Sequence, residues 1–83
     1  MDVLLTKEAN KQYKRLIGAD KEKIDKKILL LFRDSYSGKK LSGEFIGKLS
    51  LKAWPYRIIY IIDESKKIIW ILSILHHQGV YKK

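Results

Sequence analysis

The chain has 83 residues, and 18 lysines and arginines against 9 aspartates and glutamates give it a formal net charge of +9. This length suits one domain and leaves no room for a second. Hydrophobic residues make up 46% of the chain, which excludes a disordered basic tail. Cysteine is absent, which excludes a disulfide framework and a thiolate metal site and favours a reducing compartment.

The chain carries no pattern typical of a membrane or secreted protein. A charge stands at Asp2, and the first residues lack the apolar core of a signal peptide. The longest apolar stretches, 58–62 and 68–72, are far shorter than a membrane-spanning helix. We therefore expect a cytoplasmic protein with no membrane contact.

Positive charge is concentrated in the second part of the chain. Residues 1–34 hold nine basic and six acidic residues, a net charge of +3. Residues 35–83 hold nine basic and three acidic residues, a net charge of +6. Such a field attracts a polyanion, so nucleic acid or an acidic protein is the expected partner.

The first part of the chain predicts a strand and two helices. Residues 3–5 form a short apolar run typical of a strand, and Thr6 is placed to cap a helix. Apolar residues at i, i+4, i+7 and i+8 predict a first helix that stops at Gly18 and a second that Asp20 caps. The short connection predicts an antiparallel helical hairpin. The two apolar stripes are Ala9, Tyr13, Leu16 and Ile17, then Ile24, Ile28, Leu31 and Phe32.

The second part predicts strands. From Lys48 the pattern alternates between polar and apolar residues, which predicts a half-buried strand with a solvated basic face. Residues 56–62 and 68–75 are rich in β-branched and aromatic side chains, as in central strands, and Trp54 and Trp70 are expected to pack. The order β-α-α-β-β-β predicts the α+β class, with an N-terminal helical hairpin packed on one face of a mainly antiparallel four-stranded sheet.

Several kinds of site are excluded. His76 and His77 are adjacent, so on a strand they point to opposite faces and cannot share one metal ion. The carboxylates are not clustered, and the glycines lack the spacing of a phosphate-binding loop. We therefore expect no metal and no small-molecule cofactor.

The remaining chemistry belongs to cations, histidines and a phenol. RNA cleavage without a metal needs a base for the 2′-hydroxyl proton, an acid for the departing 5′-oxygen and cations for the charge at phosphorus. Histidine suits the acid or base role near neutral pH, and the arginine fork matches phosphate oxygens. Each residue also has a structural explanation, such as a solvated strand face or a ring packed at the sheet rim. The set is Lys48, Lys52, Arg57, His76 or His77, and Tyr81.

Three segments resemble the RelE/ParE toxin superfamily. They are Leu-Ser-Gly-Glu-Phe-Ile-Gly at 41–47 with Lys-Leu-Ser-Leu after it, Tyr-Arg-Ile-Ile-Tyr at 56–60, and the ending at 75–81. The resemblance covers nearly the whole chain and implies a single RelE/ParE-like toxin domain over residues 1–83. It implies the toxin of a type II toxin–antitoxin pair, with an acidic antitoxin as partner. RelE-like members cleave mRNA on the translating ribosome, leaving a 2′,3′-cyclic phosphate and a 5′-hydroxyl.

The resemblance also implies roles for single residues. Lys48 matches a lysine that activates the 2′-hydroxyl or holds the phosphate, and Arg57 matches the arginine that stabilises the transition state. Tyr81 matches a tyrosine that stacks on the substrate base or assists proton transfer. His77 stands where RelE has arginine, although several relatives use a nearby histidine as the general acid. The implied catalytic residues are Lys48, Arg57, His77 and Tyr81, and the implied RNA-binding residues are Lys52, Ser50, His76, Lys82 and Lys83.

Two alternatives stay open on the same fold. ParE-like members poison DNA gyrase and do not cleave RNA, and the fold alone does not separate the two activities. A catalytically decayed module that binds RNA or the ribosome is the second alternative, which the histidine at position 77 keeps open. The combination of an acid, a base and a phosphate clamp favours the nuclease.

Overall fold

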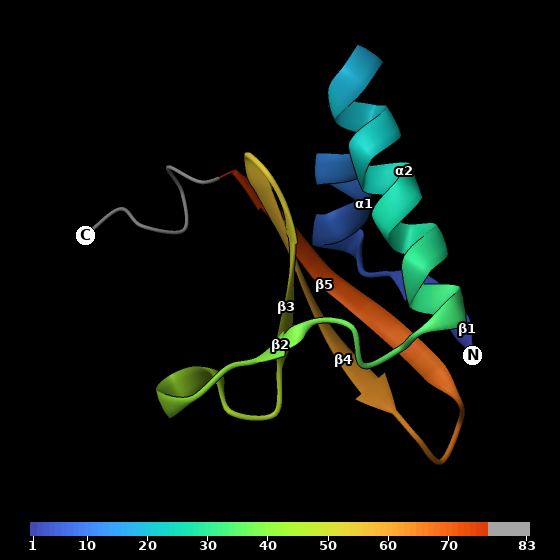
Figure 1. The fold of residues 1–83 in the computed structure, drawn as a ribbon, viewed down its shortest axis with the longest axis vertical. Helices are drawn as coiled ribbons and strands as arrows, with labels where there is room; N and C mark the ends of the chain where they lie inside the picture. Colours follow the sequence, from blue (N-terminus) through green and yellow to red (C-terminus); the bar gives the residue numbers. More distant parts are fainter. Residues whose placement is uncertain (77–83) are drawn as a thin grey trace.

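A computed structural model of the chain describes residues 1–76 (Figure 1). It confirms the α+β class and the predicted order of the main elements, but the described residues form five strands rather than four. The additional strand consists of only two lysines. It is defined by hydrogen bonds to the backbone of a neighbouring strand, so no alternation in the sequence marks it. The elements are β1 (Asp2–Leu5), α1 (Lys7–Lys14), α2 (Gly18–Arg33), β2 (Lys39–Lys40), a 3₁₀ helix (Gly43–Phe45), β3 (Leu49–Ala53), β4 (Tyr56–Asp63) and β5 (Ile68–His76).

The strands form one mainly antiparallel sheet in the order β1-β5-β4-β3-β2. Among the described strands, only β1 runs parallel to its neighbour, β5. Along β4, Arg57 lies opposite Lys52 of β3 and Leu75 of β5. The register between β4 and β5 shifts after Ile59, because one extra residue of β5 is accommodated there.

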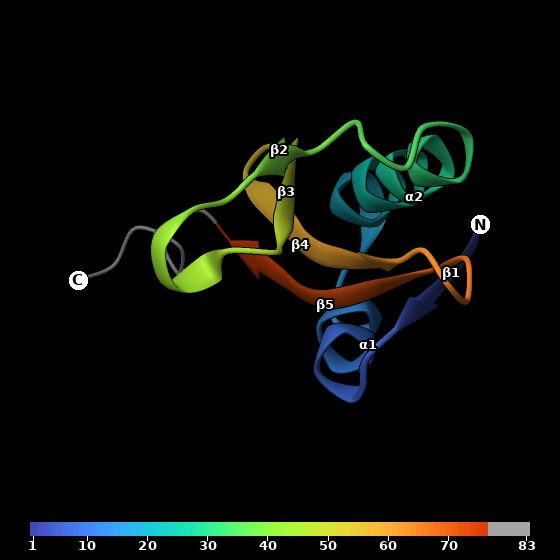
Figure 2. The ribbon, with the colours of Figure 1, turned by 90° about the horizontal axis from the view of Figure 1, so that it is seen from below.

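The hydrophobic core lies between α2 and one face of the sheet (Figure 2). Ile24 and Leu31 of α2 are fully buried, as are Ile58 and Tyr60 of β4. Burial of each such side chain contributes roughly 1.5–3 kcal/mol relative to solvent exposure. The opposite face of the sheet is not covered by α2.

Helix α1 lies against the edge of β5 rather than flat on the sheet (Figure 2). Thr6 caps α1 as predicted, because its hydroxyl accepts a hydrogen bond from the Ala9 amide at 3.2 Å. The same hydroxyl donates to the Leu72 carbonyl at 2.9 Å, and the Gln12 side-chain oxygen accepts from the Ile74 amide at 2.6 Å. On this side of β5, strand β1 pairs only with residues 68–71. Beyond them, the side chains of Thr6 and Gln12 supply the hydrogen bonds that a neighbouring strand would otherwise make with the β5 backbone.

The connection between the helices differs from the prediction. Helix α2 begins at Gly18, whose φ of +56° turns the chain into the helix, so Asp20 lies in the first turn and is not the cap. Ile17 is 80% exposed and Phe32 is 49% exposed, so neither completes an apolar stripe. No helix in residues 1–76 is long and apolar enough to cross a membrane.

Candidate functional site

A groove of about 510 Å³ lies on the sheet face that α2 leaves uncovered, because its lining residues in β4 alternate with those of the core. Its floor is formed by the central strands, and its walls by the segment before β3 and the start of α1. The lining combines two cations, one carboxylate, two hydroxyls and apolar side chains. The lining residues are Glu8, Leu41, Phe45, Lys48, Ser50, Arg57, Ile59, Leu72, Ser73 and Leu75.

Backbone hydrogen bonds hold the wall that carries Lys48. The Leu41 amide donates to the Lys48 carbonyl at 3.0 Å, and the Lys48 amide donates to the Phe45 carbonyl at 3.0 Å. The resulting tight loop places the Lys48 ammonium 5.5 Å from the centre of the Phe45 ring. This is cation–π distance, so the ring helps to position the charge beside the groove.

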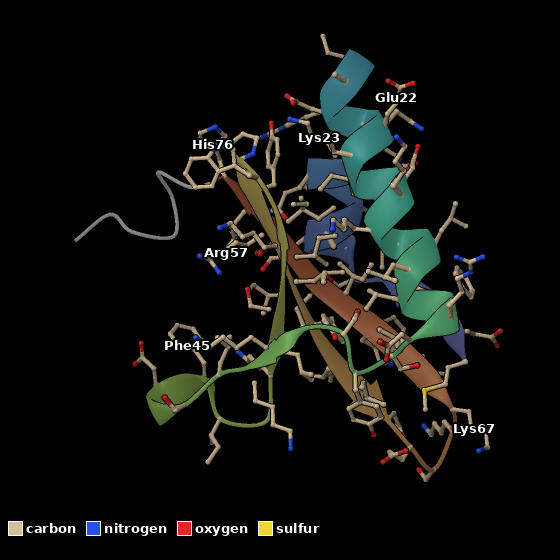
Figure 3. All side chains as sticks on the ribbon, viewed as in Figure 1. Glu22, Lys23, Phe45, Arg57, Lys67 and His76 are labelled. Atoms are coloured by element: carbon tan, nitrogen blue, oxygen red, sulfur yellow. The ribbon has the colours of Figure 1, made fainter. Side chains whose placement is uncertain are left out.

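Arg57 enters the groove from the central strand β4. Its neighbours along the strand, Tyr56 and Ile58, belong to the core side, so alternation directs Arg57 to the uncovered face. Figure 3 shows Arg57 and Phe45 on the side of the sheet remote from α2. The arginine therefore brings a planar, permanently charged hydrogen-bond donor to the groove.

Ser50 of β3 is buried in the groove floor rather than solvated as the alternating pattern predicted. It is 4% exposed, and within residues 1–76 its hydroxyl has no hydrogen-bond partner. Leaving a buried hydroxyl unpaired costs about 1–3 kcal/mol. This unpaired hydroxyl lies beside the groove that contains Lys48 and Arg57.

The structure brings together three of the predicted site residues, Lys48, Ser50 and Arg57. Lys52 lies outside the groove, in a separate cleft beside Trp54. His76 ends β5 opposite Tyr56, and the two rings meet edge to face at 5.2 Å. This pairing puts His76 on the opposite sheet face from Arg57. The predicted residues His77, Tyr81, Lys82 and Lys83 lie outside the described residues.

Glu8 and Phe45 are among the groove residues that the sequence did not predict. Glu8 was not identified as a site residue, because nothing in the sequence shows that Thr6 ties the start of α1 to β5. Phe45 lies inside the segment 41–47 that carries the family resemblance, which was the signal available for it.

Among residues 1–76, no three histidine, aspartate or glutamate side chains lie close enough to hold a metal ion. The chemistry available in the groove is therefore that of cations, hydroxyls and one carboxylate. This set is suited to binding an anion such as a phosphodiester.

The sequence matches the model of a known toxin family. A family model described as the ParE toxin of the type II toxin–antitoxin system parDE matches residues 3–81. The chain belongs to this toxin family. It is thus a member of the RelE/ParE superfamily, as the sequence motifs predicted.

Solved structures of toxins share the fold of this ParE-family chain. A YoeB/ParE toxin from Agrobacterium tumefaciens is 21% identical, with a TM-score of 0.80 over 93% of this chain and 99% of the other. The RelBE2 toxin–antitoxin complex from Mycobacterium tuberculosis contains a chain 26% identical, with a TM-score of 0.73 over 90% and 95% of the two chains. The isolated E. coli RelE toxin is 19% identical, with a TM-score of 0.77 over 90% and 82%. No curated protein sequence matches the chain.

Proposed function

We propose that this toxin is a metal-independent endoribonuclease that cleaves mRNA on the ribosome and inhibits translation in the cytoplasm. The observation that carries the proposal is the groove that joins Lys48 and Arg57 with the unpaired Ser50 hydroxyl. Two cations and a hydroxyl donor suit a phosphodiester whose charge increases during reaction.

In the proposed reaction the RNA 2′-hydroxyl loses its proton and its oxygen attacks the adjacent phosphorus. The bond from phosphorus to the 5′-oxygen breaks, and that oxygen gains a proton. The products are a 2′,3′-cyclic phosphate and a 5′-hydroxyl, with no net consumption of water. Arg57 and Lys48 stabilise the negative charge on the phosphate oxygens, and Ser50 donates a hydrogen bond to one of them.

The proton transfers need a base and an acid. Glu8 is the carboxylate in the groove lining, and we assign it the proton from the 2′-hydroxyl. The sequence supplies His77 as the acid for the 5′-oxygen, one residue beyond the end of β5. Tyr81 is assigned to stacking on the substrate base, with Lys82 and Lys83 on the RNA backbone.

The test is an in vitro translation reaction with added toxin, in which primer extension maps new mRNA 5′ ends. Arg57→Ala should lower the cleavage rate about 100-fold or more, because loss of one preorganised donor to the transition state costs that much in comparable enzymes. Arg57→Lys should restore only part of the rate, since the two-pronged contact is lost. Lys66→Ala, in the exposed turn between β4 and β5, is the matched control and should cleave normally. Equal cleavage by Arg57→Ala and Lys66→Ala would overturn the proposal.

The family description favours one alternative function, inhibition of DNA gyrase, because the matching model is that of a ParE toxin. This activity needs a binding surface and no proton transfer. A supercoiling assay with purified gyrase distinguishes gyrase inhibition from RNA cleavage. Loss of supercoiling together with intact mRNA in the translation reaction would select the gyrase inhibitor.

We also propose a cognate acidic antitoxin as the protein partner. Related toxins occur in complexes of this kind, such as RelBE2. The net charge of +9 suits an acidic chain that covers the Lys48 and Arg57 side of the sheet. This arrangement would block the substrate phosphate from reaching the groove.

A further inference from the structure

A second charged cleft, of about 380 Å³, lies between α2 and the turn from β3 to β4. It shares no lining residue with the groove that contains Arg57. Four of its six lining residues are lysines, and its lining contains no carboxylate. The residues of this lysine cleft are Lys23, Lys26, Lys27, Lys52, Ala53 and Trp54.

The lysines of α2 are gathered on one side of the helix. Lys23, Lys26 and Lys27 follow the i, i+3 and i+4 spacing that puts side chains on a common face. Lys23 and Lys27 are like charges one turn apart, an arrangement that destabilises a helix. The Lys23 ammonium also donates to the Trp54 carbonyl at 3.2 Å, which ties the helix to the turn. An anionic ligand would offset the repulsion.

Trp54 contributes a different kind of contact. It was expected to pack, but it is 55% exposed at the end of the β3–β4 hairpin. The Lys52 ammonium lies 5.8 Å from the centre of the Trp54 ring. An exposed aromatic ring beside lysines is the combination that proteins use for single-stranded nucleic acid, because bases stack on the ring and phosphates bind the cations.

We propose that the lysine cleft binds single-stranded RNA, with one base stacked on Trp54 and neighbouring phosphates on the α2 lysines. An acidic peptide would use the charges alone, whereas a nucleic acid uses both the charges and the ring. The choice of RNA rests on the proposed function, but binding in the cleft requires no cleavage. The cleft adjoins the groove, because Lys52 is the cross-strand neighbour of Arg57, and it adds affinity without taking part in the chemistry.

The test uses the whole chain and a fluorescent dodecameric oligouridine, with affinity measured by anisotropy over a range of salt concentrations. Lys23→Ala/Lys27→Ala should weaken binding about tenfold and lower the salt slope by about 1.4, since each phosphate contact on a single strand contributes about 0.7. Lys11→Ala/Lys14→Ala removes the same charge from the exposed side of α1. This control variant should have the same salt slope as the original protein.

The ring is tested separately. Trp54→Ala should weaken binding by about 5- to 100-fold, the range for loss of one base-stacking ring, and Trp54→Phe should restore most of the affinity. In a Trp70→Phe protein, whose remaining tryptophan is Trp54, the oligonucleotide should quench the fluorescence.

Three results would overturn the inference. The first is an equal effect of the two double-lysine variants, and the second is normal affinity in Trp54→Ala. The third is loss of binding in Arg57→Ala with normal binding in both cleft variants, which would place the RNA in the groove alone. Cleft-dependent binding without any mRNA cleavage would instead support the cleft and contradict the nuclease.

Discussion

Tyr60 is fully buried, and its hydroxyl holds the segment that leads into β2. It donates to the Ser35 carbonyl at 3.0 Å and accepts from the Gly38 amide at 3.0 Å. Burial raises the pKa of the Tyr60 phenol, so the hydroxyl keeps its proton and can donate. One buried side chain thereby anchors the chain just before the wall of the groove.

Gly38 has no room for a larger residue. A β-carbon at this position would lie 2.6 Å from the Tyr60 hydroxyl. Gly38→Ala should therefore lower the free energy of unfolding by about 1–3 kcal/mol, as overpacking typically does. Urea denaturation measures the change, and Lys39→Ala, at the exposed next residue, should stay within about 0.5 kcal/mol of the original protein. A Gly38→Ala protein as stable as Lys39→Ala would show that the loop is not fixed by this contact.

Asp25 joins the two helices and should make the stability depend on pH. It accepts a hydrogen bond from the Tyr13 hydroxyl at 2.6 Å and pairs with Lys21 at 3.0 Å. These contacts lower the pKa of Asp25 in the folded protein. Because the folded-state pKa is below the unfolded one, the stabilisation is present above about pH 4 and is lost as the pH falls through the folded pKa.

Asp25→Asn should therefore destabilise the protein at pH 7 and have a smaller effect near pH 3. Urea denaturation at the two pH values gives the difference in unfolding free energy between the variant and the original protein. Glu22→Gln, an exposed change on the same helix, should show little difference at either pH. A constant Asp25→Asn effect across this range would contradict the assigned role.

At the scale of elements, α1 serves as the edge neighbour of β5. Gln12→Ala would leave the Ile74 amide without its acceptor, so we expect a loss of about 1–3 kcal/mol in unfolding free energy. Hydrogen exchange at the Ile74 amide should also be faster in Gln12→Ala than in the original protein. Gln12→Glu keeps an acceptor oxygen and should retain most of the protection. Unchanged exchange in Gln12→Ala would mean that α1 does not hold this edge.

The sequence predicted those elements whose side chains follow a regular period. Alternation and β-branching identified β3, β4 and β5, and the Thr6 cap located the start of α1. The two-residue strand β2 was missed because it is defined by pairing with β3, and no local pattern marks that pairing. The position of α1 also depends on a tertiary contact, the one between Thr6 and Leu72.

At the scale of the whole molecule, basic side chains within residues 1–76 line two neighbouring sites, the groove and the lysine cleft. Lys48 and Arg57 were predicted from the match of their charges to a phosphate and from their positions in the segments that resemble the RelE/ParE superfamily. Glu8 and the exposed Trp54 could not be predicted as site residues, since their roles follow from how α1 and α2 meet the sheet. The two proposals together assign cleavage of RNA to the groove and binding of RNA to the lysine cleft.

The most direct test of RNA cleavage in the groove is to remove the attacking oxygen from the substrate. An mRNA with a single 2′-deoxynucleotide at a mapped cleavage position is translated with the toxin, and primer extension compares that position with unmodified positions in the same message. Because the 2′-oxygen is the nucleophile, cleavage should disappear at the deoxy position and continue elsewhere. Continued cleavage at the deoxy position would contradict the proposed mechanism.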